Sequence, residues 1–261
     1  MIFYFTATGN SLYVAKQLSK DCRSIPKVIH GDCHYRAESI GIVCPVYGHE
    51  MPAMVKRFFA KAELETDYFY LILTYGNRHG GAAELAEVYL RGIGKQADYI
   101  NTIKMADNFL PAFDMEEQVA TLPEKKIEEH IDKIKKDIFE RKHRIQTASE
   151  EDRAVHQAYL KRQEAIPDKT WAELYTVTEE CIGCGICMRV CPAGCITLKE
   201  QRAIHHPLDD AGNLVCEVCM ACIHNCPKNV IRLNIPEKNE NARYRNEHIH
   251  LPELVEANCQ Q

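Results

Sequence analysis

The carboxyl-terminal half of the chain contains two runs with the same cysteine spacing, Cys181-Ile-Gly-Cys184-Gly-Ile-Cys187-Met-Arg-Val-Cys191-Pro192 and Cys216-Glu-Val-Cys219-Met-Ala-Cys222-Ile-His-Asn-Cys226-Pro227. With Cys195 between them, these runs hold nine of the 13 cysteines. A disulfide framework normally needs an oxidising compartment. The first residues, Met1-Ile2-Phe3-Tyr4-Phe5, lack the basic region and the small-residue cleavage site of a secretory signal. We therefore expect a cytoplasmic protein whose cysteines bind metal.

The spacing within each run suits an iron–sulfur cluster. Gaps of two residues let three successive thiolates converge on one cube, and the gap of three before Cys-Pro directs the fourth thiolate away. Gly183 and Gly185 fit such a loop, because the backbone must turn closely and aim amide N–H groups at sulfide. Four-cysteine zinc sites use similar pairs, but not eight cysteines with two Cys-Pro endings. The sequence predicts two 4Fe–4S clusters, with zinc as the alternative.

This segment resembles the two-cluster bacterial ferredoxins. In such proteins the fourth cysteine of each run ligates the cluster of the other run. The resemblance implies that the first cluster is held by Cys181, Cys184, Cys187 and Cys226. It implies that the second is held by Cys216, Cys219, Cys222 and Cys191. For Cys195 we expect a buried free thiol, and a substitute ligand is the alternative.

The amino-terminal half alternates short apolar runs with helical patterns. Candidate strands cover residues 2–6, 25–29, 40–45, 68–74 and 98–104, and helical stretches cover 11–19, 52–60, 82–92 and 116–143. Several of the strands are continuous apolar runs, as expected when both faces of a sheet are covered. The alternation predicts an α/β fold with a doubly wound parallel sheet.

Three loops of this half carry candidate ligand-binding residues. Thr6-Ala7-Thr8-Gly9-Asn10-Ser11 follows the first strand, and hydroxyls with helix-start N–H groups make a phosphate cradle. A simple helix N-cap at Asn10 or Ser11 is the alternative. The third strand ends in Pro45-Val46-Tyr47-Gly48-His49, and the fourth in Thr74-Tyr75-Gly76-Asn77-Arg78. All three loops would lie at the carboxyl edge of the sheet, where open α/β sheets bind ligands.

At these loops the amino-terminal half resembles a flavodoxin, since residues 6–11 match its Thr/Ser-x-Thr-Gly-Asn-Thr phosphate loop with Ser11 last. The resemblance implies strand order 2-1-3-4-5 and bound FMN. Its phosphate would lie on Thr6, Thr8, Gly9, Asn10 and Ser11. The ring would lie between Pro45, Val46, Tyr47 and Gly48 on one side and Thr74, Tyr75, Gly76 and Asn77 on the other, with Tyr47 or Tyr75 stacked on it. The acidic residues common around the ring in flavodoxins are not evident; His49, Arg78 and His79 are there instead.

The whole chain resembles the flavodoxin–ferredoxin fusions of anaerobes, which are EFR-type ferredoxins or iron–sulfur flavoproteins. We expect an FMN domain over 1–143, a partly helical linker over 144–175, a small α+β ferredoxin domain over 176–236 and a polar tail over 237–261. The expected function is transfer of single electrons between the two 4Fe–4S clusters and FMN. The alternatives are an FMN-dependent reductase of a quinone, nitro compound or enone, and a redox sensor.

Composition narrows the partners. The 261 residues are 46% hydrophobic, which is ordinary for a soluble globular protein. Their net charge of −5 argues against nucleic-acid binding. No apolar run approaches the roughly 18–20 residues that a membrane span needs. We expect redox proteins as partners, and the negative charge of this chain would direct docking to basic patches on them. A homodimer is a further possible assembly.

Overall fold

The computed structural model describes residues 1–167 and 169–260. Asp168, within the expected linker, and Gln261, at the end of the expected tail, lie outside the described residues. The chain divides into two compact units, and each is described by itself. The first unit is Met1–Phe5, Asn10–Ala106 and Thr121–Ala165, and the second is Thr6–Gly9, Asp107–Ala120 and Ile166–Gln261.

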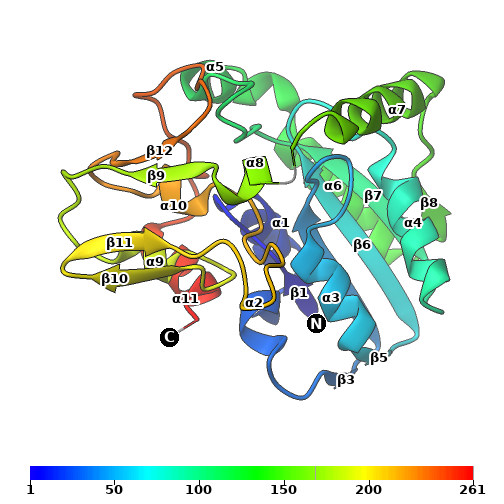
Figure 1. Ribbon diagram of the computed structural model, residues 1–261. Coiled ribbons are helices and arrows are strands. Elements are labelled where there is room, and N and C mark those ends of the chain that lie inside the picture. The colour runs from blue at the N-terminus through cyan, green and yellow to red at the C-terminus, as the bar shows by residue number, and fades with distance from the viewer. Residues whose placement is uncertain (168, 261) are drawn as a thin grey trace. The chain divides into compact units, whose positions relative to one another are not determined.

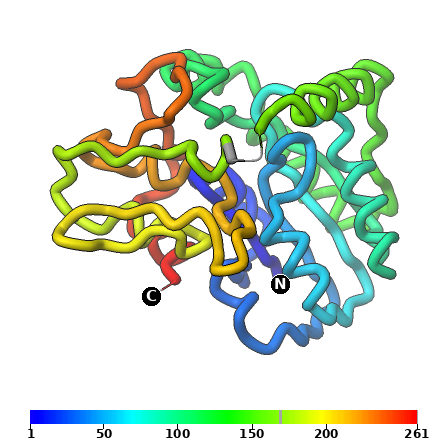
Figure 2. Tube along the Cα trace, in the orientation of Figure 1, coloured from blue at the N-terminus to red at the C-terminus, as the bar shows by residue number. Residues whose placement is uncertain are grey.

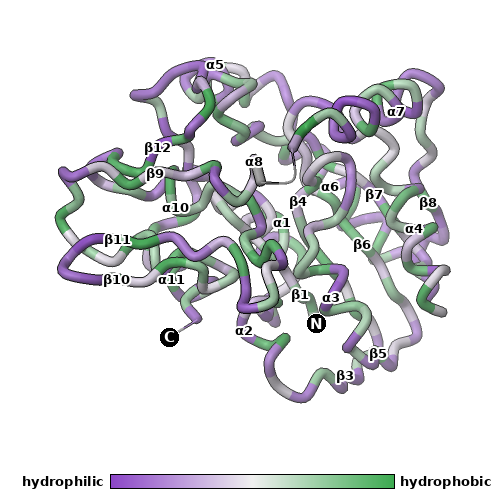
Figure 3. Tube along the Cα trace, viewed as in Figure 1, coloured by the Kyte–Doolittle hydropathy of each residue, from purple (hydrophilic) through white to green (hydrophobic). Residues whose placement is uncertain are grey.

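A six-stranded, all-parallel sheet forms the centre of the first unit (Figure 1). Its order is β2 (Cys22–Ser24), β1 (Ile2–Tyr4), β4 (Ser39–Pro45), β6 (Tyr68–Tyr75), β7 (Tyr99–Lys104) and β8 (Arg144–Ile145). The two longest strands, β4 and β6, are mainly apolar and almost wholly buried (Figure 3). Burial along the whole strand follows from cover on both faces, and the α/β class is as expected.

Helices cover the sheet. The helices α1 (Asn10–Leu18) and α6 (Ile127–Phe139) pack together, and the Tyr13 hydroxyl donates to Glu128 Oε1 at 2.5 Å. The helices α3 (Ala53–Lys61) and α4 (Ala82–Gly92) lie on the near face in Figure 1. The remaining elements of this unit are α2 (Ile25–Val28), the parallel pair β3 (His34–Arg36) and β5 (Glu63–Glu65), the 3₁₀ helix η1 (Leu122–Lys125), and α7 (Glu150–Glu164).

Two predicted elements are wrong in detail. The strand predicted over 25–29 is instead helix α2, and the strand β2 ends just before it at Ser24. The cause is Pro26 in the first turn, where a helix does not use the missing N–H. The single helix predicted over 116–143 is broken into α5 (Met115–Ala120), η1 and α6, with Pro123 in the break.

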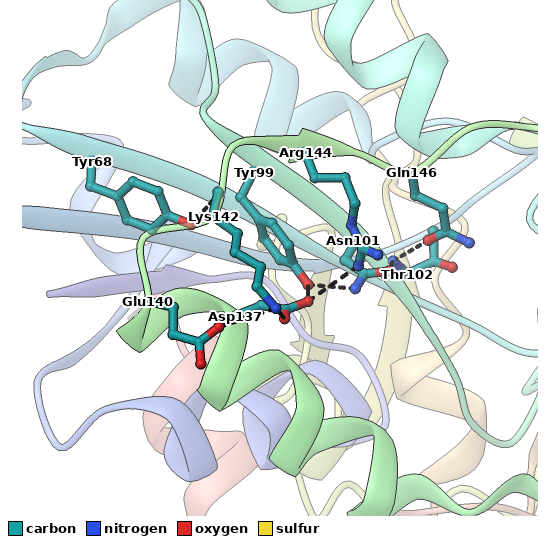
Figure 4. A network of polar contacts seen from close by, with 9 residues as sticks. All are labelled: Tyr68, Tyr99, Asn101, Thr102, Asp137, Glu140, Lys142, Arg144 and Gln146. Carbon is teal, nitrogen blue, oxygen red and sulfur yellow. Dashed lines mark hydrogen bonds and ion pairs between the residues drawn. The ribbon is translucent and has the colours of Figure 1, made fainter.

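The strand β8 lies inside the segment expected to be a linker. It is held by the buried carboxylate of Asp137 on α6, which is 2% exposed (Figure 4). Arg144 Nη2 and the Tyr99 hydroxyl lie 3.2 and 3.0 Å from Asp137 Oδ2, and Lys142 Nζ lies 2.6 Å from Oδ1. Burial alone would raise the pKa of this carboxyl, but the hydrogen bonds from Lys142 and Tyr99 outweigh it and lower the pKa.

The second unit has small sheets and short helices. Its antiparallel pairs are β9 (Tyr175–Val177) with β12 (Ile231–Leu233), and β10 (Ile196–Lys199) with β11 (Arg202–His205), the hairpin drawn in yellow in Figure 2. Its helices are α5, α8 (Lys169–Ala172), α9 (Ile186–Arg189), α10 (Ala221–His224) and α11 (Leu251–Asn258). The expected tail is not wholly polar, because α11 buries Leu254, Ala257 and Asn258. Among the described residues, every helix is too short or too polar to cross a bilayer.

Candidate functional site

Two cavities in the second unit are lined by the cysteines of the two runs. The first cavity is lined by Cys181, Cys184, Cys187 and Cys226, with apolar neighbours that include Leu198 and Ile231. The second is lined by Cys191, Cys216, Cys219 and Cys222, with Tyr175 and Ile196. Each cavity therefore has three cysteines from one run and the last cysteine of the other.

The backbone repeats between the two runs. Gly183 and Val218, each two residues after the first cysteine of its run, have φ angles of 65° and 51°. Gly185 and Met220, each one residue after the second cysteine, have φ angles of 71° and 60°. Left-handed residues alternating with right-handed ones turn successive amide N–H groups inward and form a concavity for anions. Two non-glycine residues adopt this costly conformation in the second run, so the loop shape is imposed by more than local preference.

The sulfur atoms also have matching backbone donors. The amide of Cys195 donates to Cys191 Sγ at 3.3 Å, and the amide of Val230 donates to Cys226 Sγ at 3.4 Å. Each donor lies four residues after the cysteine that ends its run. Such bonds stabilise the thiolate form that binds iron, and they tune the potential of a bound cluster.

Cys195 is 3% exposed and lies beside two of the predicted ligands. Its thiol interacts with Cys191 and Cys216, and hydrogen bonding to Cys195 is the largest cause that lowers the pKa of Cys216, to about 5. Burial raises the pKa of Cys219 and Cys222 instead, so these thiols ionise when a metal replaces the proton.

The arrangement of the cysteine sulfurs bears on whether the two cavities suit zinc or an iron–sulfur cube. Among the described residues, no three His, Cys, Asp or Glu side chains are grouped to hold one metal ion. A tetrahedral zinc site with Zn–S bonds of about 2.3 Å needs its sulfurs much closer together than ligands around a four-iron cube. The Tyr175 hydroxyl is buried beside the Met220 backbone, which donates to its oxygen, and Tyr175 lines the second cavity. An O–H in this position suits sulfide as acceptor.

The predicted flavin residues of the first unit meet at the carboxyl edge of the sheet. Ser11 Oγ, at the start of α1, lies 2.8 Å from Thr74 Oγ1 near the end of β6. The Val46 amide donates to the Thr74 carbonyl at 2.8 Å. Pro45 ends β4, and Asn10 Nδ2 donates to Ala106 O at 3.0 Å. Four further predicted residues lie in the same two loops: Tyr47, Gly48, Gly76 and Asn77.

Each of the two candidate stacking tyrosines contacts another ring of the protein edge-on. Tyr47 packs edge-on against Phe5 with ring centroids 6.3 Å apart. Tyr75 ends β6 and packs edge-on against His79 at 5.1 Å. Stacking of either tyrosine on a flavin stays a prediction.

The segment Thr6–Gly9 belongs to the second unit. Thr6 Oγ1 accepts from the Gly9 amide at 3.2 Å, and Thr8 Oγ1 accepts from Asn108 Nδ2 at 3.1 Å. Both hydroxyls are acceptors in these bonds, so each O–H stays able to donate to an anionic oxygen. Gly9 has a φ of 104°, and a Cβ there would lie 3.0 Å from the Cβ atoms of Asn246 and Ile249. The loop thus supplies the neutral donors that a phosphate group needs, and it requires glycine.

Helix α7 packs on the loops after β4 and β6, which the sequence did not predict. A Cβ on Gly48 would lie 2.2 Å from Tyr159 Oη, and a Cβ on Gly80 would lie 2.3 Å from the His49 ring. His49 Nδ1 and His156 Nδ1 are 3.3 Å apart. Burial, with the charges of His156 and His79, lowers the pKa of His49 to about 4.

Arg78, in the loop after β6, pairs with Glu151 of α7 at 3.1 Å. His79 lies 3.7 Å from Asp152 of the same helix. The capping box at Ser149 and Asp152 was a sequence signal for the start of α7, but nothing in the sequence marked its docking position.

Similarity to known proteins agrees with the cysteine geometry. A family model of the 4Fe-4S dicluster domain matches residues 180–230. An uncharacterized ferredoxin of Methanocaldococcus jannaschii is 34% identical over 71 residues, which are 26% of this chain and 88% of that protein. Through its carboxyl-terminal part, this chain belongs to the 4Fe-4S dicluster ferredoxins.

Two other relatives share only the ferredoxin domain. One of the subunits of the F(420)H(2) dehydrogenase of Methanosarcina mazei is 40% identical over 53 residues, or 18% of this chain and 15% of that protein. A ferredoxin-like protein in the nif region of Trichormus variabilis is 37% identical over 54 residues, or 21% of this chain and 42% of that protein. The chain thus spans less than half the length of these two relatives.

The ferredoxin domain is linked to the segment Thr6–Gly9 by two hydrogen-bonded bridges within the second unit. In the first bridge, His224 Nε2 lies 2.8 Å from Asn108 O, and Asn108 Nδ2 binds Thr8 Oγ1. His224 stands between Cys222 and Cys226, and its Nδ1 accepts from the Tyr244 amide at 3.0 Å.

In the second bridge, Asn258 Nδ2 donates to Thr6 O at 3.0 Å and to Val190 O at 3.2 Å. Val190 precedes Cys191 in the chain. Neither His224 nor Asn258 is recognisable from the sequence, because a histidine or asparagine that acts through long-range contacts has no local signature.

Proposed function

We propose that this chain is an electron-transfer protein that holds two 4Fe–4S clusters in its ferredoxin domain and FMN at the carboxyl edge of its parallel sheet. The observation that carries the proposal is the pair of cysteine-lined cavities, each with three sulfurs from one run and one from the other. When bound, the clusters supply one-electron transfer and the flavin supplies one- or two-electron chemistry.

The proposed cluster ligands are the eight cysteines that line the cavities. Cys181, Cys184, Cys187 and Cys226 would hold the first cluster, and Cys216, Cys219, Cys222 and Cys191 the second. The backbone around them keeps amide donors near the sulfurs, and apolar side chains line both cavities while Cys184 is exposed. Both effects set the potential of an iron–sulfur centre.

The proposed flavin site uses the Thr6–Ser11 loop for the phosphate and the loops after β4 and β6 for the ring. The loop has no Lys or Arg, so its hydroxyl and amide groups would bind the phosphate as neutral donors. The dianion would keep its charge, which disfavours further negative charge on the ring and so favours a low flavin potential.

His224 and Asn258 are positioning residues in this proposal. His224, between Cys222 and Cys226, reaches the proposed phosphate loop through Asn108. Asn258 joins Thr6 to the Val190 carbonyl beside Cys191, and neither residue needs to change its protonation. Their hydrogen bonds fix the loop relative to the cluster peptides inside the second unit, and a fixed path between centres favours transfer of an electron. The partners would be other redox proteins, and the net charge of −5 favours docking to basic patches.

The decisive experiment is anaerobic purification with iron, sulfide, zinc and FMN measured per chain, followed by a redox titration. We expect about eight irons, since two cubes carry four each, and about one FMN. The Thr8→Val variant should lose FMN and keep its iron, while Ser19→Ala, just past α1, should keep both. Zinc in place of iron would contradict the cluster assignment, and full iron without any flavin would contradict the FMN assignment.

The second candidate is an FMN-dependent reductase of a quinone, nitro compound or enone. The observation in its favour is the pairing of His49 and His156 beside Tyr159 at the loops of the sheet edge, because such groups could hold a substrate oxygen. Turnover of these compounds by the chemically reduced protein, lost in Tyr159→Phe with FMN retained, would favour the reductase over the carrier.

A further inference from the structure

A cavity of about 460 Å³ lies in the first unit between α6, β7 and β8. This volume falls within the roughly 300–1,000 Å³ of small-molecule sites. Tyr75 is the one residue of the predicted cofactor sites that lines it, and the cluster cysteines are not part of it. The cavity therefore needs an explanation of its own.

The wall of this cavity is cationic. Lys104 from the end of β7, Lys133 from α6 and Arg144 from β8 line it together with the imidazole of His130, and none of the described lining residues is an Asp or Glu. The chain as a whole is acidic, with a net charge of −5. Positive groups thus converge at one concave place of a negatively charged protein.

Two of these cations have no counter-ion in the described part of the chain. The other lysines of α6, Lys135 and Lys136, pair with Asp132 and Glu140 of the same helical surface. Lys133 and Lys104 have no acidic partner among the described residues. Like charges that face one cavity repel each other, and an anion in the cavity would relieve this repulsion.

The remaining polar groups are held rigidly. Arg144 is fixed by Asp137 and lies over the Tyr99 ring, 5.7 Å from its centroid. Gln146 Oε1 accepts from the Thr102 amide at 2.8 Å, which leaves its NH₂ group as a donor (Figure 4). A guanidinium on β8 and an amide two residues later in the chain, both held by hydrogen bonds, are well suited to orient oxygen atoms of a ligand.

From these observations we propose that the cavity binds a small polyanion, with two or more negatively charged oxygens of carboxylate or phosphate type. Lys104 and Lys133 supply the charge, and Arg144 and Gln146 supply directed hydrogen bonds. The bound ligand lies beside Tyr75 at the end of β6. The site does not depend on the flavin, because its cationic residues are not part of the flavin loops.

Calorimetric titration of the anaerobically purified full chain tests the proposal, with citrate for the carboxylates and pyrophosphate for the phosphates, against sodium chloride at equal ionic strength. We expect saturable binding of one ligand per chain for at least one compound. Binding of citrate alone assigns a carboxylate ligand, binding of pyrophosphate alone a phosphate ligand, and binding of both a general polyanion site. The Lys104→Gln/Lys133→Gln double variant should weaken binding at least tenfold.

The matched control is Lys135→Gln, which removes a paired lysine from the same helix and should leave the affinity within twofold. Iron and FMN are measured in every variant, so that loss of a cofactor is distinguished from loss of the anion. The proposal is overturned if neither compound gives more heat than chloride, or if Lys135→Gln weakens binding as much as the double variant. It is also overturned if the double variant loses FMN, because the cavity would then belong to the flavin site.

Discussion

Gly183 has no space for a side chain. Its φ is 65°, and a Cβ would lie 2.4 Å from the backbone carbonyl oxygen of Gln201 in the β10–β11 turn. We predict that Gly183→Ala displaces the loop that carries Cys181 and Cys184. Iron should then fall from about eight to about four per chain, because one of two four-iron cubes is lost. Iron analysis and the cluster absorption of the anaerobic protein measure this loss.

Gly212 is the matched control for this change. It has a φ of 82°, so alanine costs similar backbone strain, but nothing lies within 4 Å of its added Cβ. Gly212→Ala should keep about eight irons. Equal iron in the two variants would mean that contact with Gln201 does not hold the first loop in place.

We predict that His49 makes the stability of the protein sensitive to mild acid. Its pKa is lowered to about 4 by burial and by His156 and His79, against an ordinary value of about 6.5. Between these two values the unfolded chain binds a proton that the folded chain does not, so stability falls as the pH decreases from 6.5 to 4.

His49→Asn should remove this loss and tolerate the backbone φ of 71°, because asparagine adopts left-handed conformations readily. The slope of unfolding free energy against pH should drop by up to about 1.4 kcal/mol per pH unit. Thermal unfolding from pH 4 to 7 measures it. An unchanged slope in His49→Asn would contradict this role of His49.

At the scale of elements, one carboxylate joins β7, β8 and α6. Asp137 is buried and accepts from Tyr99, Lys142 and Arg144. Asp137→Asn should lower the free energy of unfolding by about 1–3 kcal/mol at pH 7, since hydrogen bonds to a charged acceptor are lost. Asp132→Asn, which removes an exposed carboxylate from the same helix, should change it by less than about 0.5 kcal/mol. Urea titration compares the two variants.

The difference in unfolding free energy between wild type and Asp137→Asn should depend on pH in a defined way. The folded pKa of Asp137 lies below its ordinary value of about 3.9, so the stabilisation is complete above that value and is lost as the pH falls through the folded pKa. The gap between wild type and Asp137→Asn should therefore narrow below pH 4. A constant gap down to pH 2 would show that the charge of Asp137 has no part in it.

The elements predicted well are those whose residues are buried along their whole length. The strands β4 and β6 are continuous apolar runs, and their pattern alone identified them. The strand β8 has two residues, Arg144 and Ile145, which give no periodic signal. Its place in the sheet depends on Asp137 and Lys142, which are tertiary contacts. The helix α2 was missed because a short apolar run with an early proline fits a strand and a helix equally well.

At the scale of the whole molecule, the two units should respond differently to loss of metal. The first has a six-stranded sheet with a large apolar core, and the second has two-stranded sheets and several helices of four residues. A small unit of this kind needs its metal centres for stability. Anaerobic removal of iron with a chelator should abolish amide protection over residues 181–226 and preserve it in β4 and β6.

Hydrogen exchange with mass spectrometry reads both regions in one experiment, and reconstitution with iron and sulfide is the control that should restore protection. Simultaneous loss of protection in β4 and β6 would contradict independent stability of the first unit. Full protection of 181–226 without iron would contradict a structural role for the clusters.

The candidate site was predictable where chemistry dictates spacing. Cysteines separated by two and by three residues identify a cube-binding loop without any knowledge of the fold, and the matching family model supports that identification. The packing of His156 and Tyr159 against the sheet-edge loops could not be predicted, because α7 is a polar helix whose docking depends on complementary shape at Gly48. The cationic cavity could not be predicted either, because Lys104, Lys133 and Arg144 are distant in sequence and meet only in the folded protein.

The exchange of the last cysteine between the two runs also bears on biosynthesis. During translation, the first cavity stays one sulfur short until Cys226 has left the ribosome, although Cys181, Cys184 and Cys187 emerge much earlier. The set of four cysteines that line the second cavity is complete only after Cys222 has been synthesised. Under the proposed ligand assignment, neither cube could be completed on a nascent polypeptide that stops before residue 222.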